Sequence, residues 1–377
     1  MVALQDFLAA VSGTLPVLIR WYWDLLDRKA RRNLPRAADP GRINTVADFI
    51  EALRINPAVQ FPHVRVLRVD EIQSDTPHDS SRSGPPGGSY EKLGSNEKIS
   101  PREILCTYSD EPDWGMDQDL FEIGRYGYGP CPFGPKTGQS SQAPFHMAFT
   151  SENRLVSALF PGLKRSFVEE RVRVSYGLAR LAFGTGMDYW GWRFTGWAMH
   201  YLQDITQPYH AKALPFPILP VLRRMVRERG LRTFAERNKN LLRNRHMMFE
   251  AVVHFLLNDA AKRYSTHELL LALAEEGNAN IGTIRTVIVQ CAHTAAHLAR
   301  RADRAVSELM RDPRVDDPNY FMGDDHSYRV DEKVPEARVL RPARFDALME
   351  LLCEMLVHTG RVTRYAVRRV EDSKASW

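Results

Sequence analysis

The sequence is poor in cysteine and contains no long apolar run, and both shortages limit what the protein can be. Its 377 residues include only four scattered cysteines with no CxxC pair, Cys106, Cys131, Cys291 and Cys353. This pattern indicates free thiols rather than a disulfide scaffold or a metal–thiolate site. A metal ion, if one is bound, must therefore have histidine and carboxylate ligands. No apolar stretch approaches the length needed to span a bilayer.

The amino terminus lacks the basic start of a secretory signal. Residues 1–29 contain an acid at Asp6 and no basic residue before Arg20. An amphipathic first helix explains this segment better than a leader peptide does, although the apolar run leaves an export signal open. The compartment is unknown at this stage, and the pattern favours a cytoplasmic or peripheral-membrane location over secretion.

Helical periodicity dominates the chain. Apolar residues make up 44% and charged residues 26%, which is typical of a soluble globular protein. Apolar residues recur at three-to-four spacing over six segments, 3–29, 162–184, 188–206, 234–258, 280–311 and 345–370. The only strand-like piece is His63–Val69. We therefore predict an all-α, multi-helix bundle with long inserted loops and a buried metal site of several ions.

Two loop segments divide the predicted helices. Residues 74–101 have the Ser, Gly and Pro content of a linker. Residues 124–144 are rich in Gly and Pro but hold Tyr126, Tyr128 and Phe133, so we expect them to pack beside a site. The predicted organisation is a helical segment over 1–73, a linker over 74–100 and a helical domain over 101–377. The first segment either stands apart or joins that domain.

Positive charge is concentrated in one stretch. The net charge is +5, yet nine basic residues lie between positions 223 and 245, namely Arg223, Arg224, Arg227, Arg229, Arg232, Arg237, Lys239, Arg243 and Arg245. Such a stretch is either a solvated helix face or a surface for phosphate-bearing partners, which include lipid headgroups and nucleic acid. The residues before it, from Leu214 to Leu222, are apolar and proline-rich. We expect 214–245 to make a peripheral membrane contact, and a buried insertion is the alternative.

Two helical segments each carry a histidine and a carboxylate four residues apart. His200 and Asp204 share one face of a nearly all-apolar helix, and His210 follows the turn made by Pro208. His246 and Glu250 repeat the spacing on a later helix. An ionised carboxylate in so apolar a helix is costly unless it is paired or bound to metal. These nitrogen and oxygen donors suit zinc, although a single pair of this kind is more often a surface pair or a core hydrogen bond.

The motif HYLQDITQPYHA, which spans residues 200–211, resembles the signature of the zinc-dependent phospholipase C and single-strand-specific nuclease family. That family has a His, an Asp four residues on, a His six further, and a His and Glu four apart on the next helix. The QPYHA form is closer to the phospholipase branch. The resemblance covers about residues 108–258 and implies an upstream Asp and His, for which Asp113 (or Asp110) and His146 are the candidates. Either acid has a helix cap as its alternative role.

The resemblance implies two or three zinc ions. One zinc would be bound by Asp113, His146, His200 and Asp204, another by His210, His246 and Glu250, and Asp204 would bridge to any third. The family's amino-terminal Trp and helix His have no counterpart here, because no histidine precedes His63. A third ion would need other ligands, and His293 and His297 are the weak candidates.

The implied activity is zinc-dependent phosphodiester hydrolysis. Clustered zinc makes a shared water lose its proton near neutral pH and attack phosphorus, and Asp113 is placed to orient that water or take its proton. A phospholipid is the expected substrate. The alternatives are a single-strand nuclease, in which the aromatic residues of 124–144 would stack on bases, and a non-catalytic helical protein that binds membrane or nucleic acid and keeps structural metal.

Overall fold

The computed structural model describes residues 3–25, 43–68, 71, 90–94, 97–122, 126–215, 231–263, 266–277, 282–325 and 327–374. Helices dominate these ranges and the only sheet among them has two short strands, so the all-α prediction is confirmed. Strand β1 (Val64–Val66) pairs with β2 (Tyr90–Lys92) in antiparallel register, with Val64 opposite Lys92. β1 lies within the strand-like piece expected at 63–69. β2 falls inside the expected linker, most of which lies outside the described residues.

The first apolar segment forms two helices, not the single helix expected over 3–29. α1 (Leu4–Val11) and α2 (Leu15–Asp24) are separated by Ser12, Gly13 and Thr14. Pro16 lies at the start of α2, where its missing N–H costs nothing. A continuous helix would place its ring against the carbonyl of Ser12. Pro16 is therefore the residue of the sequence that indicates the break between the two helices.

The amino-terminal helices share a hydrophobic core with the centre of the molecule. α1, α2 and α4 (Val46–Leu53) pack with α5 (Pro101–Tyr108), α8 (Val168–Gly184) and α9 (Asp188–Asp204). Trp190, Phe194 and Trp197 of α9 lie at its middle, together with Phe7 and Phe49. The described part of 1–73 is therefore packed directly onto the 101–377 region.

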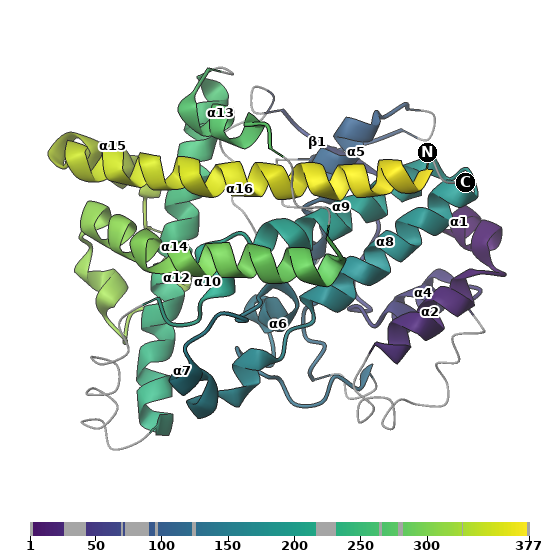
Figure 1. The fold of residues 1–377 in the computed structure, drawn as a ribbon, viewed down its shortest axis with the longest axis horizontal. Helices are drawn as coiled ribbons and strands as arrows, with labels where there is room; N and C mark the ends of the chain where they lie inside the picture. Colours follow the sequence, from purple (N-terminus) through teal and green to yellow (C-terminus); the bar gives the residue numbers. More distant parts are fainter. Residues whose placement is uncertain are drawn as a thin grey trace.

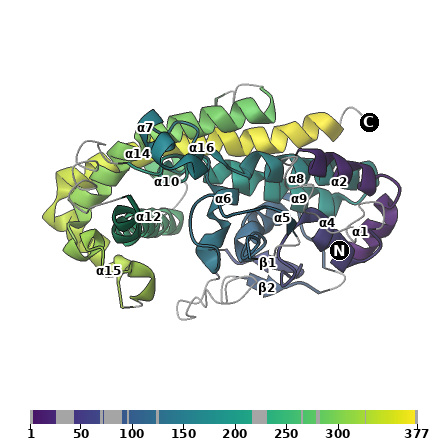
Figure 2. The same cartoon turned by 90° about the horizontal axis from the view of Figure 1, so that it is seen from below.

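The later helices form a second core. Figure 1 shows α14 (Ile284–Met310) and α16 (Pro342–Lys374) side by side, with α12 (Leu231–Lys262) running across them. In Figure 2, α12 is seen end-on below the layer that α14 and α16 make. Met248, Phe249, Val252 and Leu256 of α12 enter this core, which leaves His246 and Glu250 on another face. α13 (Glu268–Ala274) and α15 (Val330–Leu340) also contribute residues to this core.

Short helices occupy the connections between the long ones. They are α6 (Ala143–His146), α7 (Arg154–Leu159) and α10 (Pro208–Ala211), and the 3-10 helices η2 (Glu111–Trp114), η4 (Gln139–Gln142), η5 (Pro161–Lys164), η6 (Pro313–Asp316) and η7 (Met322–Asp324). Within the described ranges, every helix is too short or too polar to serve as a membrane span.

Candidate metal centre

The structure brings all seven expected ligands together from five elements. Asp113 lies on η2, His146 on α6, His200 and Asp204 on α9, His210 on α10, and His246 and Glu250 on α12. Two groups of three donors form among the described residues, Asp113–His146–His200 and His210–His246–Glu250. Within each group, hereafter the first and second triad, the ligand atoms lie within 4.8 Å of one another.

The first triad has the spacing of a metal coordination shell. His200 Nε2 lies 3.0 Å from His146 Nδ1, and Asp113 Oδ1 lies 3.7 Å from each of these nitrogens. Asp204 Oδ2 completes the group at 2.7 Å from His146 and 3.1 Å from His200. A tetrahedral zinc shell with bonds of about 2.1 Å separates its donors by about 3.4 Å. These four residues therefore surround a point where one cation fits.

Contacts outside the triad engage the outer nitrogen of each imidazole. His200 Nδ1 lies 2.7 Å from the carbonyl of Ser109, so this nitrogen donates and Nε2 faces the triad. His146 Nε2 lies 3.3 Å from Asp117 Oδ2, which leaves Nδ1 free to face the triad. His200 Nε2 and His146 Nδ1, 3.0 Å apart, are thus the two nitrogens that would bind a cation in place of a proton.

Asp117 belongs to the site although the sequence analysis did not include it among the candidate residues. This fully buried carboxylate accepts from Tyr201 Oη at 2.6 Å and pairs with Arg171 at 2.6 Å. Arg171 also donates to the carbonyls of Leu53 and Arg54, at 2.9 and 3.0 Å. A buried chain of contacts therefore runs from the amino-terminal segment to His146. The D-x3-D spacing from Asp113 was the only available signal.

Asp204 faces both triads. Its Oδ2 contacts the first triad, while its Oδ1 lies 3.4 Å from His210 Nδ1. In the second triad, Glu250 Oε1 lies 3.4 Å from His210 Nε2 and 2.9 Å from His246 Nε2. One carboxylate thus connects two groups of donors, as a bridging ligand does in a site with two metal ions.

Gln207 holds the second triad in place. Its Oε1 caps α10 by accepting from the backbone N–H groups of Tyr209 and His210. Its Nε2 donates to Glu250 Oε1 at 3.1 Å and lies 2.8 Å from His246 Nε2. Pro208 ends the preceding helix and starts α10, so the QP pair turns the chain and positions His210.

The centre carries excess negative potential. Burial by itself lowers the pKa of His146, but Asp117 and Asp204 outweigh it and raise the pKa to about 10. His210 is governed the same way, with burial opposed by Asp204 and Glu250, and its pKa also rises to about 10. The neighbouring imidazoles keep the pKa of Glu250 well below its usual range, although burial acts in the other direction. The carboxylates of the centre therefore stabilise protons on His146 and His210, and a metal cation can replace those protons.

Of the two candidate acids, the structure places Asp113 at the centre. Asp110 Oδ2 accepts from Tyr90 Oη at 2.6 Å and Trp114 Nε1 at 3.0 Å. It makes no side-chain cap on η2. The Asp113 side chain is 46% exposed and receives a hydrogen bond of 3.3 Å from Gln142. Asp113 is therefore both a donor of the triad and a carboxylate open to solvent.

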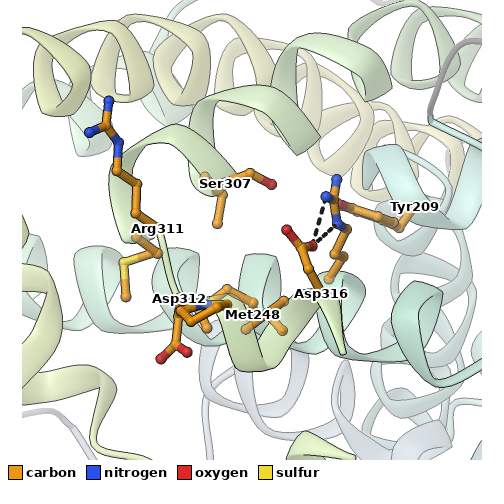
Figure 3. Close-up of a pocket in the computed structure, with 11 residues that line it drawn as sticks. Tyr209, Met248, Ser307, Arg311, Asp312 and Asp316 are labelled. Atoms are coloured by element: carbon orange, nitrogen blue, oxygen red, sulfur yellow. Dashed lines mark hydrogen bonds and ion pairs between the residues drawn. The ribbon is translucent and has the colours of Figure 1, made fainter. Parts of the chain in front are cut away.

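A polar pocket of about 300 Å³ opens onto the first triad. It is lined by Ser109, Asp110, Asp113, His200, Gln203, Asp204 and Gln207. A second pocket of about 270 Å³, shown in Figure 3, is lined by none of the seven ligands. Its lining includes Tyr209 and Arg245, the chain neighbours of His210 and His246. Tyr209 lines this second pocket and stacks on His246 at 5.3 Å, and the ion pair of Arg245 with Asp316 crosses it.

Several expected features lie elsewhere. His293 and His297 are exposed on α14 and stack on each other 6.2 Å apart, with no third donor among the described residues. Tyr126 and Tyr128 are each 2% exposed and belong to the core, whereas Phe133 is partly exposed and its ring lies 5.0 Å from that of Phe149. Most of the apolar and basic residues of 214–245 lie outside the described residues.

The donor chemistry fits zinc. Six of the seven ligands offer an imidazole nitrogen or carboxylate oxygen to one of two common points, and Asp204 offers an oxygen to each. The buried His210 Nδ1 makes no hydrogen bond and lies 3.4 Å from Asp204 Oδ1, a spacing that suits two donors of one cation. No family model, curated protein or solved structure matches the chain.

Proposed function

We propose that this chain is a zinc-dependent phosphodiester hydrolase of the phospholipase C type. The observation that carries the proposal is the position of Asp204, whose two oxygens face two separate triads of histidine and carboxylate. Asp113, His146, His200 and Asp204 would hold one zinc ion, and His210, His246 and Glu250 another. No described donor group supports a third ion.

Bound zinc supplies a Lewis acid that neutralises phosphate oxygens and lowers the pKa of water. The chain supplies orientation. Asp113 presents an exposed oxygen to the polar pocket, where it accepts a hydrogen bond from the attacking water or takes its proton. Ser109 contacts the outer nitrogen of His200, and Asp117 contacts that of His146. These contacts hold both imidazoles in the orientation in which they would bind zinc.

The open pocket favours catalysis over a structural role for the metal. A structural zinc site is closed by four protein ligands, whereas this centre borders a pocket that admits a small molecule. The burial of Tyr126 and Tyr128 leaves Phe133 as the one partly exposed aromatic residue of the described part of 124–144, which makes base stacking by a nuclease less favoured. A phospholipid, or a related phosphodiester at a membrane surface, is therefore the proposed substrate.

The test compares zinc-loaded and chelator-treated protein on three substrates: phosphatidylcholine vesicles, single-stranded DNA and a soluble chromogenic phosphodiester. We expect turnover only with zinc and highest on the vesicles. His200→Ala and Asp204→Ala should each lower turnover by at least about a hundredfold, because even changes behind metal ligands cost roughly 10- to 100-fold. His293→Ala, an exposed histidine outside the centre, is the matched control. Full activity after metal removal would rule out the proposal.

A further inference from the structure

Arg243 lies on the same helix face as two of the candidate zinc ligands. It precedes His246 by three residues and Glu250 by seven on α12. At about 100° per residue, its direction differs from theirs by roughly 60° and 20°. Helical side chains also lean toward the helix amino terminus, so Arg243 extends beyond the second triad along one line with it.

The contacts of Arg243 leave most of its donors available. The guanidinium carbon lies 4.0 Å from the centre of the Phe321 ring, and one terminal nitrogen donates to Ser140 Oγ at 3.2 Å. In the described part of the chain Arg243 forms no ion pair, although the charge of Asp324 on η7 acts on it from a longer distance. Arg245, two residues on, instead pairs with Asp303 and Asp316 at 2.7 Å each.

The surroundings hold this guanidinium at the edge of the centre. The buried Asn244 donates to the carbonyl of Tyr320 and accepts from the N–H of Met322, both at 2.8 Å, so Phe321 is fixed beneath Arg243. Ser140 belongs to η4, whose Gln142 donates to Asp113 in the first triad. Arg243 is therefore anchored to an element that also contacts the first triad, while its helix carries the second.

We infer that Arg243 binds an anionic oxygen of the substrate's phosphate group beside the second triad. A half-buried guanidinium that forms no ion pair with a described residue, and feels Asp324 only from a distance, is costly unless an anion contacts it directly. Stacking on Phe321 uses the face of the group and leaves its N–H edge, which matches phosphate geometry. The inference rests on the proposed function and deepens it: Arg243 is a residue that selects a phosphate-bearing substrate.

The test measures binding of inorganic phosphate to the zinc-loaded protein by calorimetry. Arg243→Met should weaken binding roughly 10- to 100-fold, because a charge-assisted pair of hydrogen bonds is lost. Arg243→Lys should fall between, since it keeps the charge and loses the two-pronged geometry. Arg300→Met, which removes an exposed arginine of α14, should bind phosphate as the wild type does. Zinc content and melting temperature confirm that each variant is loaded and folded.

Activity assays then separate the two proposals and the two sources of phosphate. On both the soluble diester and phosphatidylcholine vesicles, Arg243→Met should raise KM more than it lowers kcat, because the phosphate is common to both. An effect on vesicles alone, or phosphate binding as tight as in the wild type, would overturn the inference while leaving the hydrolase proposal standing. Phosphate binding that depends on Arg243 in a protein that hydrolyses none of the substrates would support the anion site and refute the hydrolase.

Discussion

At the scale of single residues, the candidate metal centre depends on Asp117 as much as on its ligands. This buried carboxylate contacts His146, Tyr201 and Arg171. It lies against Nε2 of His146, so that Nδ1 faces the first triad. Asp117→Asn keeps the shape but removes the charge that holds the imidazole. We expect zinc affinity to fall roughly 10- to 100-fold. Competition against a chromophoric chelator measures it, with the exposed Asp346→Asn as control; equal affinity in both variants would contradict this role.

The sequence indicates the candidate ligands more clearly than it indicates the groups that support them. His200, Asp204, His246 and Glu250 are visible because a four-residue spacing puts two side chains on one helix face. The carbonyl of Ser109 that orients His200 is 91 residues away and has no side-chain identity to recognise. Gln207 stands out in the sequence only as part of the HYLQDITQPYHA motif. Its contacts with α12 depend on how the two cores pack against each other.

At the scale of elements, the closeness of α5 and α9 positions His200. Gly196 lies one turn before His200, and a Cβ added there would come within 3.0 Å of the Tyr108 backbone and 3.1 Å of Ser109 N. Gly196→Ala must therefore push α5 away, together with the Ser109 carbonyl. We expect a loss of about 1–3 kcal/mol in unfolding free energy and weaker zinc binding.

The matched control is Gly184→Ala near the end of α8, where an added Cβ meets nothing within 4 Å. It should leave zinc binding unchanged and have little effect on stability, or raise it by up to about 1 kcal/mol. Chemical denaturation and zinc titration of both variants provide the measurement. A Gly196→Ala protein indistinguishable from Gly184→Ala would show that the two helices can separate without cost.

Periodicity predicted the long helices because each buries one apolar face. α8, α9, α12, α14 and α16 all lie where three-to-four spacing placed them. The short α6 and α10 could not be predicted in this way, because four residues are too few to show a period. They are formed by prolines and by tertiary contacts, such as the 2.8 Å hydrogen bond from Ala148 N–H to the carbonyl of His210.

At the scale of the whole molecule, the candidate centre joins two hydrophobic cores. α9 belongs to the cores around α8, whereas α12 packs with α14 and α16. The first triad is further tied to the amino-terminal segment through Arg171, which donates to Leu53 and Arg54. A cation at the centre would therefore crosslink α9, α10 and α12, in addition to the hydrogen bonds from Gln203 to Thr363 and from Gln207 to Glu250 that already join these parts of the chain.

Zinc should stabilise the protein more as the pH rises. In the metal-free protein, His146 and His210 have pKa values raised to about 10, against an unfolded value near 6.5. The stability that their protonation contributes is fully present below about pH 6.5 and is lost as the pH rises toward 10. Zinc replaces these protons, so the melting temperature of the metal-free protein should fall between pH 6.5 and 9 while that of the zinc-loaded protein changes less. With zinc at about a thousand times its Kd the gain is about 4 kcal/mol, or roughly 5 °C for a chain of this size. Differential scanning calorimetry with His200→Ala as control checks it, and a gap between the two forms that narrows with pH would show that protons and zinc do not compete for this centre.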